Sequence, residues 1–236
     1  MNTVAIYTAI FGSFDWLKTH PDIPGVDFVA FTDDESLTAR EDWRVITVPP
    51  SNNPRLTAKY PKIVGPQSPP LDSYEATIWI DGSMEILTPA FGEAFADLGP
   101  DDLALFRAEH GDCIHEEARR SIGWDKYDGQ PIREQVEYYR SLGYPDHAGL
   151  WPCAVIGRAK STRVDALMSD WMGEIERWSL QDQISLPFVL WQHGFTPHEW
   201  PHYPPGNDGC RHPVENPWLF LHTHSAWPMN WAGGRI

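Results

Sequence analysis

Short apolar runs alternate with turn-rich segments over residues 1–110. Five of these runs are almost continuously apolar and rich in β-branched or aromatic residues, namely Val4–Ile10, Phe28–Thr32, Arg44–Val48, Thr77–Ile80 and Leu103–Phe106. Continuous apolar runs of this length are typical of strands that are buried on both faces of a sheet. The alternation therefore favours an α/β fold in which helices cover the sheet.

Residues 112–195 follow a different, helical periodicity. Apolar side chains within residues 132–139 are spaced as on one face of a helix, and an apolar stripe over Val164–Trp178 predicts a longer helix. Ser179 precedes Asp182 by three residues, which is a start signal for a further helix. This region of the chain is therefore expected to be mainly helical.

Three further segments complete the expected architecture. Leu56–Val64 is predicted to contain one helical turn before Pro61, and Ala154–Ile156 to form another strand. From Gly194 onward Pro, Gly, His and Trp dominate, so this tail is expected to wrap the domain with little regular structure. No repeat or linker interrupts the chain. We therefore expect one domain over residues 1–236, with a strand-rich region over residues 1–110, a helical region over residues 111–195 and a C-terminal wrap over residues 196–236.

Composition narrows the classes of function. The 236 residues include 33 acidic and 18 basic side chains, a formal net charge of −15, which argues against binding nucleic acid through its phosphate backbone. Three scattered cysteines exclude a disulfide framework and a cysteine-built zinc site. No apolar run is long enough to span a membrane, and the first residues predict a strand rather than a signal peptide. These features predict a cytoplasmic protein.

Two segments of the strand-rich region carry groups suited to an anionic ligand. The segment Asp81–Ser83 follows a buried strand, where open α/β sheets bind ligands, and a carboxylate there suits Mg²⁺ or Mn²⁺ bound to substrate phosphates. Arg55, Lys59 and Lys62 form a dense cationic cluster, and such side chains clamp phosphate oxygens well. The simpler alternatives are a β-turn in the first case and a solvated basic face in the second.

Two later segments also carry candidate groups. Asp182 and Gln183 stand in the first turn of a predicted helix, where the carboxylate is either a cap or, with the amide, faces a sugar at its reacting carbon. His222 and His224 alternate across one residue, so on an extended segment they face the same side, where either can ligate a metal. A structural role is the alternative for each histidine.

Seven segments, taken in order, resemble one protein family. They are YTAIFGSFD, FVAFTDD, the R-x-x-x-K cluster, YEATIWIDGSMEI, CIHEEA, REQVEYYRSLGYP and MSDWMGEIERWSLQDQISLPFVLW. Over Ile6–Trp191 this order is similar to the TOD1/MUCI70 glycosyltransferase-like family, formerly a domain of unknown function. The resemblance implies a GT-A-like (Rossmann-like) fold with a mixed, mostly parallel sheet, distantly related to glycosyltransferase family 8. It also implies an enzyme that uses a nucleoside diphosphate sugar, with UDP as the expected nucleotide.

The resemblance also assigns the nucleotide contacts. It implies that the base and ribose lie beside the loop after the first strand, with the residues Thr8, Ala9, Phe11, Gly12 and, after the second strand, Asp33. Arg55 and Lys59 would then approach the diphosphate. These residues together form the expected donor site.

The metal and the catalytic pair are implied in the same way. Asp81 would open the D-x-D motif that holds Mn²⁺ or Mg²⁺, with Gly82 in the middle, but Ser83 replaces the second aspartate. The metal shell would therefore need Ser83 or a tail histidine such as His222 or His224. Asp182 and Gln183 resemble the D-Q pair of related retaining enzymes, in which the amide lies beneath the anomeric carbon.

The acceptor is less defined by the sequence. The many Trp and Tyr residues of the C-terminal third suit stacking on sugar faces and favour a glycan or polysaccharide acceptor, unless they simply fill the core. A modified base in DNA is a second possible acceptor, against which the net charge argues. Two other classes stay open, a carbohydrate-binding protein without catalysis and a nucleotide-sugar hydrolase that uses Asp81.

Overall fold

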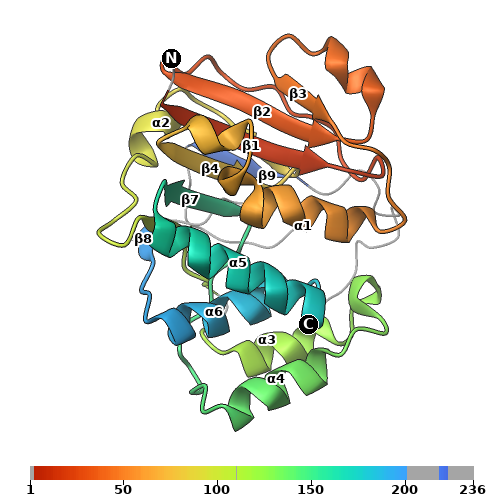
Figure 1. The fold of residues 1–236 in the computed structure, drawn as a ribbon, viewed down its shortest axis with the longest axis vertical. Coiled ribbons are helices and arrows are strands. Elements are labelled where there is room, and N and C mark those ends of the chain that lie inside the picture. The colour runs from red at the N-terminus through yellow and green to blue at the C-terminus, as the bar shows by residue number, and fades with distance from the viewer. Residues whose placement is uncertain (1–2, 110, 201–217, 223–236) are drawn as a thin grey trace.

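The computed structural model describes residues 3–109, 111–200 and 218–222. Its centre is a seven-stranded sheet in the order β3–β2–β1–β4–β7–β6–β8 (Figure 1). These strands are β1 (Val4–Ile10), β2 (Val26–Thr32), β3 (Arg44–Thr47), β4 (Ala76–Ile80), β6 (Leu103–Phe106), β7 (Val155–Ala159) and β8 (His198–Trp200). Every neighbouring pair is parallel except the two that involve β7, so the sheet is mixed and mostly parallel, as predicted.

Helices cover the sheet, and most of them gather below it in Figure 1. They are α1 (Pro54–Val64), α2 (Phe91–Ala94), α3 (Ile114–Ser121), α4 (Ile132–Ser141), α5 (Thr162–Arg177) and α6 (Asp182–His193). Helix α5 packs on both α1 and α6, and α3 packs on α4 and α6. This stack places the start of α6 close to α1, although the two helices are far apart in the sequence.

The apolar core lies on both faces of the sheet. Adjacent residues of one strand join different clusters: Tyr7 packs on the side of α5 and α6, and Ile6 on the side of α2. Successive side chains of a strand point to opposite faces, so a strand buried on both faces is apolar throughout. The double burial explains why the predicted strands appear as continuous apolar runs.

Helix α1 is longer than the sequence predicts. The Asn53 side chain accepts a hydrogen bond from the backbone N–H of Leu56 and caps the start, and the helix continues through Pro61 to Val64. Proline normally ends or kinks a helix because it lacks the N–H donor. Here the last turn is held from outside, since the Arg158 guanidinium donates to the backbone carbonyls of Lys62 and Ile63 at 2.6 Å each.

The tail contains more regular structure than predicted within its described residues. His198–Trp200 forms β8 at the edge of the main sheet, and β9 (Leu219–Leu221) pairs with β5 (Met84–Ile86) in a two-stranded sheet. Three residues are too few for an alternating pattern to be recognised in the sequence.

The division of the domain at residues 110 and 195 stays a prediction, as does the cytoplasmic location. Within the described residues no helix has the length and apolar character needed to cross a bilayer.

Two glycines provide a matched test of the packing. A Cβ on Gly157 in β7 would lie 2.5 Å from Cη2 of Trp200 and 2.6 Å from Cδ2 of Leu98, whereas a Cβ on Gly173 in α5 would meet nothing within 4 Å. We expect Gly157→Ala to lower the free energy of unfolding by about 1–3 kcal/mol through overpacking. Gly173→Ala should raise it by up to ~1 kcal/mol through helix propensity. Urea denaturation of both variants measures this, and equal stabilities would contradict the packing of β7.

Candidate functional site

A cleft of about 490 Å³ opens where β1 and β4 end. Its walls come from the residues after β1, one face of α1, the end of β4, the turn 124–127 and the first turn of α6. Beyond Pro54 at its start, α1 contributes Arg55, Ala58, Lys59 and Lys62, whose spacing of three and four residues puts them on one side of a helix. The cationic cluster of the sequence therefore points into the cleft.

Four charged side chains meet at the bottom of the cleft. The Asp182 carboxylate accepts from Lys59 Nζ at 2.6 Å and from Lys62 Nζ at 2.8 Å. Lys62 Nζ also donates to Asp81 Oδ1 at 3.0 Å, and the same oxygen accepts from Trp79 Nε1 at 2.7 Å. Lys62 is the most enclosed of the four charged groups, with 5% of its side chain exposed. These ion pairs connect α1, the end of β4 and the start of α6, which also share one apolar cluster.

The protonation states follow from this pairing. Burial alone would raise the pKa of Asp182, but the charges of Lys59 and Lys62 outweigh it and hold that pKa below its usual range. Burial would lower the pKa of Lys62, but Asp182 and Asp81 outweigh it, so this pKa is raised. For Lys59 burial prevails over the attraction of Asp182, and the pKa is lowered. Asp182 and Lys62 thus carry full charges at neutral pH.

The opposite wall combines cations with aromatic rings. Lys126 Nζ lies 4.4 Å from the ring centroid of Trp124 and 4.9 Å from that of Tyr127. Arg55 stacks its guanidinium 5.3 Å from the Tyr127 ring and donates to the Lys126 carbonyl. Neither Arg55 nor Lys126 forms an ion pair with another described residue, so both charges are available to an anion. Burial lowers the pKa of Lys126 to about 8, partly offset by Asp182.

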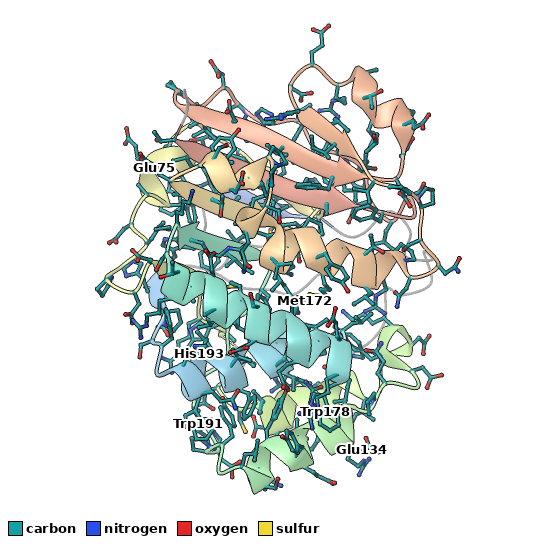
Figure 2. The ribbon with its side chains drawn as sticks, viewed as in Figure 1. Glu75, Glu134, Met172, Trp178, Trp191 and His193 are labelled. Atoms are coloured by element: carbon teal, nitrogen blue, oxygen red, sulfur yellow. The ribbon has the colours of Figure 1, made fainter. Side chains whose placement is uncertain are left out.

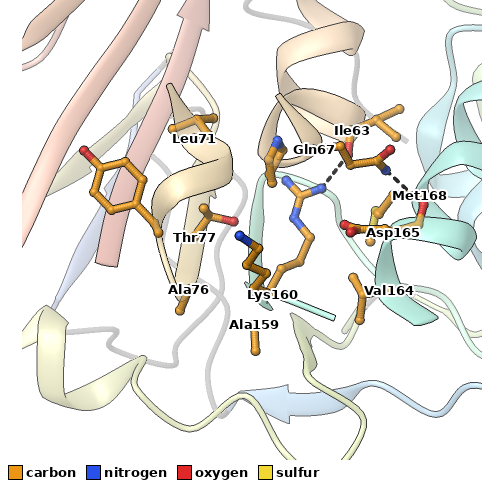
Figure 3. Close-up of a pocket in the computed structure, with 13 residues that line it drawn as sticks. Ile63, Gln67, Leu71, Ala76, Thr77, Ala159, Lys160, Val164, Asp165 and Met168 are labelled. Carbon is orange, nitrogen blue, oxygen red and sulfur yellow. Dashed lines mark hydrogen bonds between the residues drawn. The ribbon is translucent and has the colours of Figure 1, made fainter. Parts of the chain in front are cut away.

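A buried arginine supports α1 from behind. Besides the carbonyls of Lys62 and Ile63, Arg158 bonds the hydroxyl of Tyr7, which in turn donates to the Lys62 carbonyl at 3.0 Å. Burial raises the pKa of Tyr7 to about 12, so its hydroxyl stays a donor. Figure 3 shows the small cavity beside these contacts, where Gln67 donates to the Asp165 carbonyl at 2.9 Å. The α1 backbone that carries Lys62 is therefore fixed to β1 and β7, and Gln67, which follows α1, is bonded to α5.

A second network fixes the start of α6. The Tyr127 hydroxyl donates to Gln181 Oε1 at 2.9 Å, and Gln181 Nε2 donates to Glu117 at 2.9 Å and to Ser121 at 2.8 Å. Gln181, rather than Asp182, is the N-cap residue of α6, and it makes no capping bond with its side chain. The capping alternative for Asp182 is therefore wrong, because its carboxylate is used by the two lysines.

Most of the predicted site residues come together in this cleft. Its lining includes Ala9, Phe11, Gly12, Arg55, Lys59, Asp81, Gly82, Asp182 and Gln183. Oε1 of Gln183 is buried and has no hydrogen-bond partner among the described residues, so it is available to a ligand. The sequence places Lys62 in the phosphate-binding cationic cluster but not among the donor-site residues, and it gives no role to Lys126 or Gln181. The only sequence signal for Lys62 is its place on the same helix face as Arg55 and Lys59.

Four predicted residues that the structure describes lie outside the lining. Thr8 is buried within β1, and Asp33 accepts from the backbone N–H of Gly12 at 2.9 and 3.1 Å, which ties the ends of β1 and β2 together. Ser83 is buried, and its carbonyl accepts from the backbone of His222 in the segment that follows β9. The His222 ring pairs with Glu85 at 2.6 Å. His224 lies outside the described residues.

The side chains around Asp81 do not form a set of ligands for a divalent cation. Its Oδ1 already accepts from an indole N–H and an ammonium, Ser83 is buried outside the cleft lining, and the His222 ring pairs with Glu85. Among the described residues, no three His, Cys, Asp or Glu side chains group closely enough to hold an ion. Mg²⁺ requires near-octahedral oxygen ligands at about 2.0–2.1 Å. The described arrangement suits an ammonium at the place where the sequence predicts Mn²⁺ or Mg²⁺.

The tryptophans of the C-terminal third that the structure describes lie outside the cleft. None of the described ones, from Trp151 to Trp218, lines the cleft, and Trp171 is fully buried. Figure 2 shows Trp178 and Trp191 in the helical region below the sheet. The aromatic rings that do line the cleft come from earlier segments, with Phe11, Phe14, Trp79, Trp124 and Tyr127.

Comparisons with known proteins agree on the class of this fold. A family model described as TOD1/MUCI70, glycosyltransferase-like domain, matches residues 1–199. Among solved structures, an apo structure of the bifunctional glycosyltransferase WbbM is similar with a TM-score of 0.50 and 11% identity, covering 84% of this chain and 38% of WbbM. This likeness confirms the expected GT-A-like fold. Comparison with curated proteins gave no significant match.

The charge of Lys126 can be tested with an inorganic anion. Because Lys126 is charged below about pH 8 and neutral above it, pyrophosphate affinity should fall as the pH rises through that value. Lys126→Met should remove this step and bind more weakly at pH 7. Isothermal titration calorimetry from pH 6.5 to 9.5 measures both proteins, and their difference cancels the titration of pyrophosphate. Exposed Lys160→Met is the control. Parallel profiles for wild type and Lys126→Met would show that Lys126 does not face the anion.

Proposed function

Because the chain belongs to the TOD1/MUCI70 glycosyltransferase-like family, we propose that it transfers a sugar from a nucleoside diphosphate sugar to a glycan or polysaccharide hydroxyl. UDP is the proposed nucleotide. The observation that carries the proposal is the cleft at the ends of β1 and β4, into which Arg55, Lys59, Lys62 and Lys126 project. Open α/β sheets bind ligands at this edge, and four cations suit a diphosphate.

Leaving-group stabilisation is the clearest task of these cations. In the transfer, the bond between the anomeric carbon and the diphosphate oxygen breaks, and the electron pair leaves with the diphosphate. The acceptor hydroxyl oxygen forms the new bond to the anomeric carbon. Cations placed in a partly buried cleft stabilise this developing charge more strongly than solvent does. Lys59 uses one N–H on Asp182, so its other N–H groups are available to phosphate oxygens. Arg55 and Lys126 have no carboxylate partner among the described residues.

On the sugar side we propose that Asp182 acts as a fixed negative charge. Two lysines lower its pKa, which makes it a poor proton acceptor. It therefore suits stabilisation of a positively charged, oxocarbenium-like sugar rather than general-base activation of the acceptor. Gln183, with its buried and unpartnered Oε1, is adjacent and free to contact the sugar. Because neither Asp182 nor Gln183 acts as a general base in this proposal, it favours transfer with retention, in which the acceptor proton passes to the leaving diphosphate.

We propose that the acceptor enters past the aromatic rings of Phe14 and Trp124. Phe14 is 36% exposed, and Trp124 lines the cleft beside Lys126. Aromatic faces pack well against the apolar faces of sugar rings. A carbohydrate-binding protein without catalysis would share these rings, but the four buried or half-buried cations would have no use with a neutral sugar.

Arg55 gives the sharpest test of the donor site. Arg55→Met should lower UDP affinity about 10-fold or more, since a charge-assisted hydrogen bond contributes about 1.5–3 kcal/mol. A loss of kcat/KM of about 100-fold is expected if the guanidinium also stabilises the negative charge that develops on the leaving diphosphate. Calorimetry with UDP and UDP release from a panel of UDP-sugars measure the two effects. Arg119→Met, on the exposed side of α3, is the control.

The panel also separates the rival functions. Turnover of a UDP-sugar with an oligosaccharide acceptor, followed by NMR of the anomeric proton, tests transfer and retention together. An inverted product would overturn the role given to Asp182 and Gln183. Sugar binding without release of any nucleoside diphosphate would favour the carbohydrate-binding alternative.

A further inference from the structure

Lys62 occupies the point where two carboxylates from distant elements converge. Asp81 follows β4 and Asp182 begins α6, and their oxygens lie 3.0 and 2.8 Å from the same ammonium nitrogen. In sites that hold a divalent cation, carboxylates from separate elements converge in this way on the metal. Asp81 and Asp182 are therefore arranged as in a cation-binding site, and the bound cation is the Lys62 ammonium.

Displacing Lys62 by a metal would be unfavourable. Its side chain is nearly buried, and Asp81 and Asp182 are its two ion-pair partners. A metal bound to both carboxylates would leave a buried ammonium without a partner, which is strongly destabilising. The backbone cannot easily move away either, because Arg158 and Tyr7 both bind the Lys62 carbonyl. The position of the ammonium is thus set by two separate groups of contacts.

We propose that the Lys62 ammonium takes the place of the divalent cation, so that sugar transfer by this protein needs no metal. The inference rests on the proposed function and names the group that meets the leaving diphosphate. Lys62 uses two of its three N–H donors on Asp81 and Asp182, and the third is left for a diphosphate oxygen. The acceptor hydroxyl oxygen bonds to the anomeric carbon as the bond from that carbon to the diphosphate breaks, and the electron pair of the broken bond stays with the diphosphate. The hydroxyl proton passes to the diphosphate, and Lys62 and neighbouring Lys59 offset the charge that develops there.

The wild-type protein provides the first test. UDP affinity is measured by calorimetry after treatment with EDTA and again with added Mn²⁺ or Mg²⁺. We expect the two dissociation constants to agree within about 2-fold. The rate of UDP-sugar turnover should likewise agree within about 2-fold between the EDTA-treated protein and the protein with added metal. A loss of 10-fold or more with EDTA, restored by Mn²⁺, would overturn the inference while leaving the proposed function intact. Failure of UDP, GDP and ADP to bind under either condition would overturn both.

A variant that removes the ammonium provides the second test. Lys62→Ala leaves Asp81 and Asp182 facing a vacated position, so it should bind Mn²⁺, seen as loss of the free-ion signal in electron paramagnetic resonance. Its UDP affinity should fall at least 10-fold without metal and recover in some measure with Mn²⁺. Lys62→Arg keeps the charge and should stay independent of metal, and Lys160→Ala, far from the cleft, is the control.

The test on the wild-type protein and the test on Lys62→Ala are independent of each other. Tight Mn²⁺ binding by the wild-type protein, unchanged in Lys62→Ala, would show that the metal site lies elsewhere and would overturn the inference. Thermal unfolding reports whether Lys62→Ala is folded. If it is not, the comparison of wild-type protein with and without EDTA still decides.

Discussion

The partly buried ion cluster of Lys59, Lys62, Asp81 and Asp182 is the constraint on which the site depends. Burying any one of these charges alone would be strongly unfavourable, so each requires the others to be in place. The cluster therefore couples three elements that also share an apolar cluster, namely α1, β4 and α6. Such pairs add little net stability compared with apolar packing, but they define a specific arrangement. Here the arrangement places unused N–H donors at the bottom of the cleft.

The fold was largely predictable because its strands are buried on both faces. Val4–Ile10 and Leu103–Phe106 were predicted with the bounds that the structure has, since a continuous apolar run needs no tertiary information to be recognised. Helix α1 was not, because the contacts that carry it past Pro61 come from Arg158 in β7. A three-residue strand such as β8 is also beyond sequence reasoning, since its pairing with β6 decides its conformation.

The site was only partly predictable, and the difference has a clear physical origin. Residues that follow strands, such as Asp81 and Gly82, could be placed at the ligand-binding edge from general rules of α/β sheets. The role of Lys62 could not, because it depends on Asp182, 120 residues away in the sequence. His222 shows a different limit: its alternation with His224 indicates that both can face one side, but not that the His222 ring contacts Glu85, 137 residues away. Local spacing alone does not distinguish these cases.

The position of the cations below the surface of an acidic protein has a consequence for ionic strength. The net charge of −15 repels an approaching anionic donor at long range, whereas Lys62 and Lys59 attract it only after it has entered the cleft. Dissolved salt screens the first effect beyond about 8 Å but reaches the enclosed ammonium groups poorly. Moderate salt should therefore speed the encounter with a nucleotide more than it weakens the bound complex. That is the reverse of the behaviour of proteins that attract anions through an exposed basic surface.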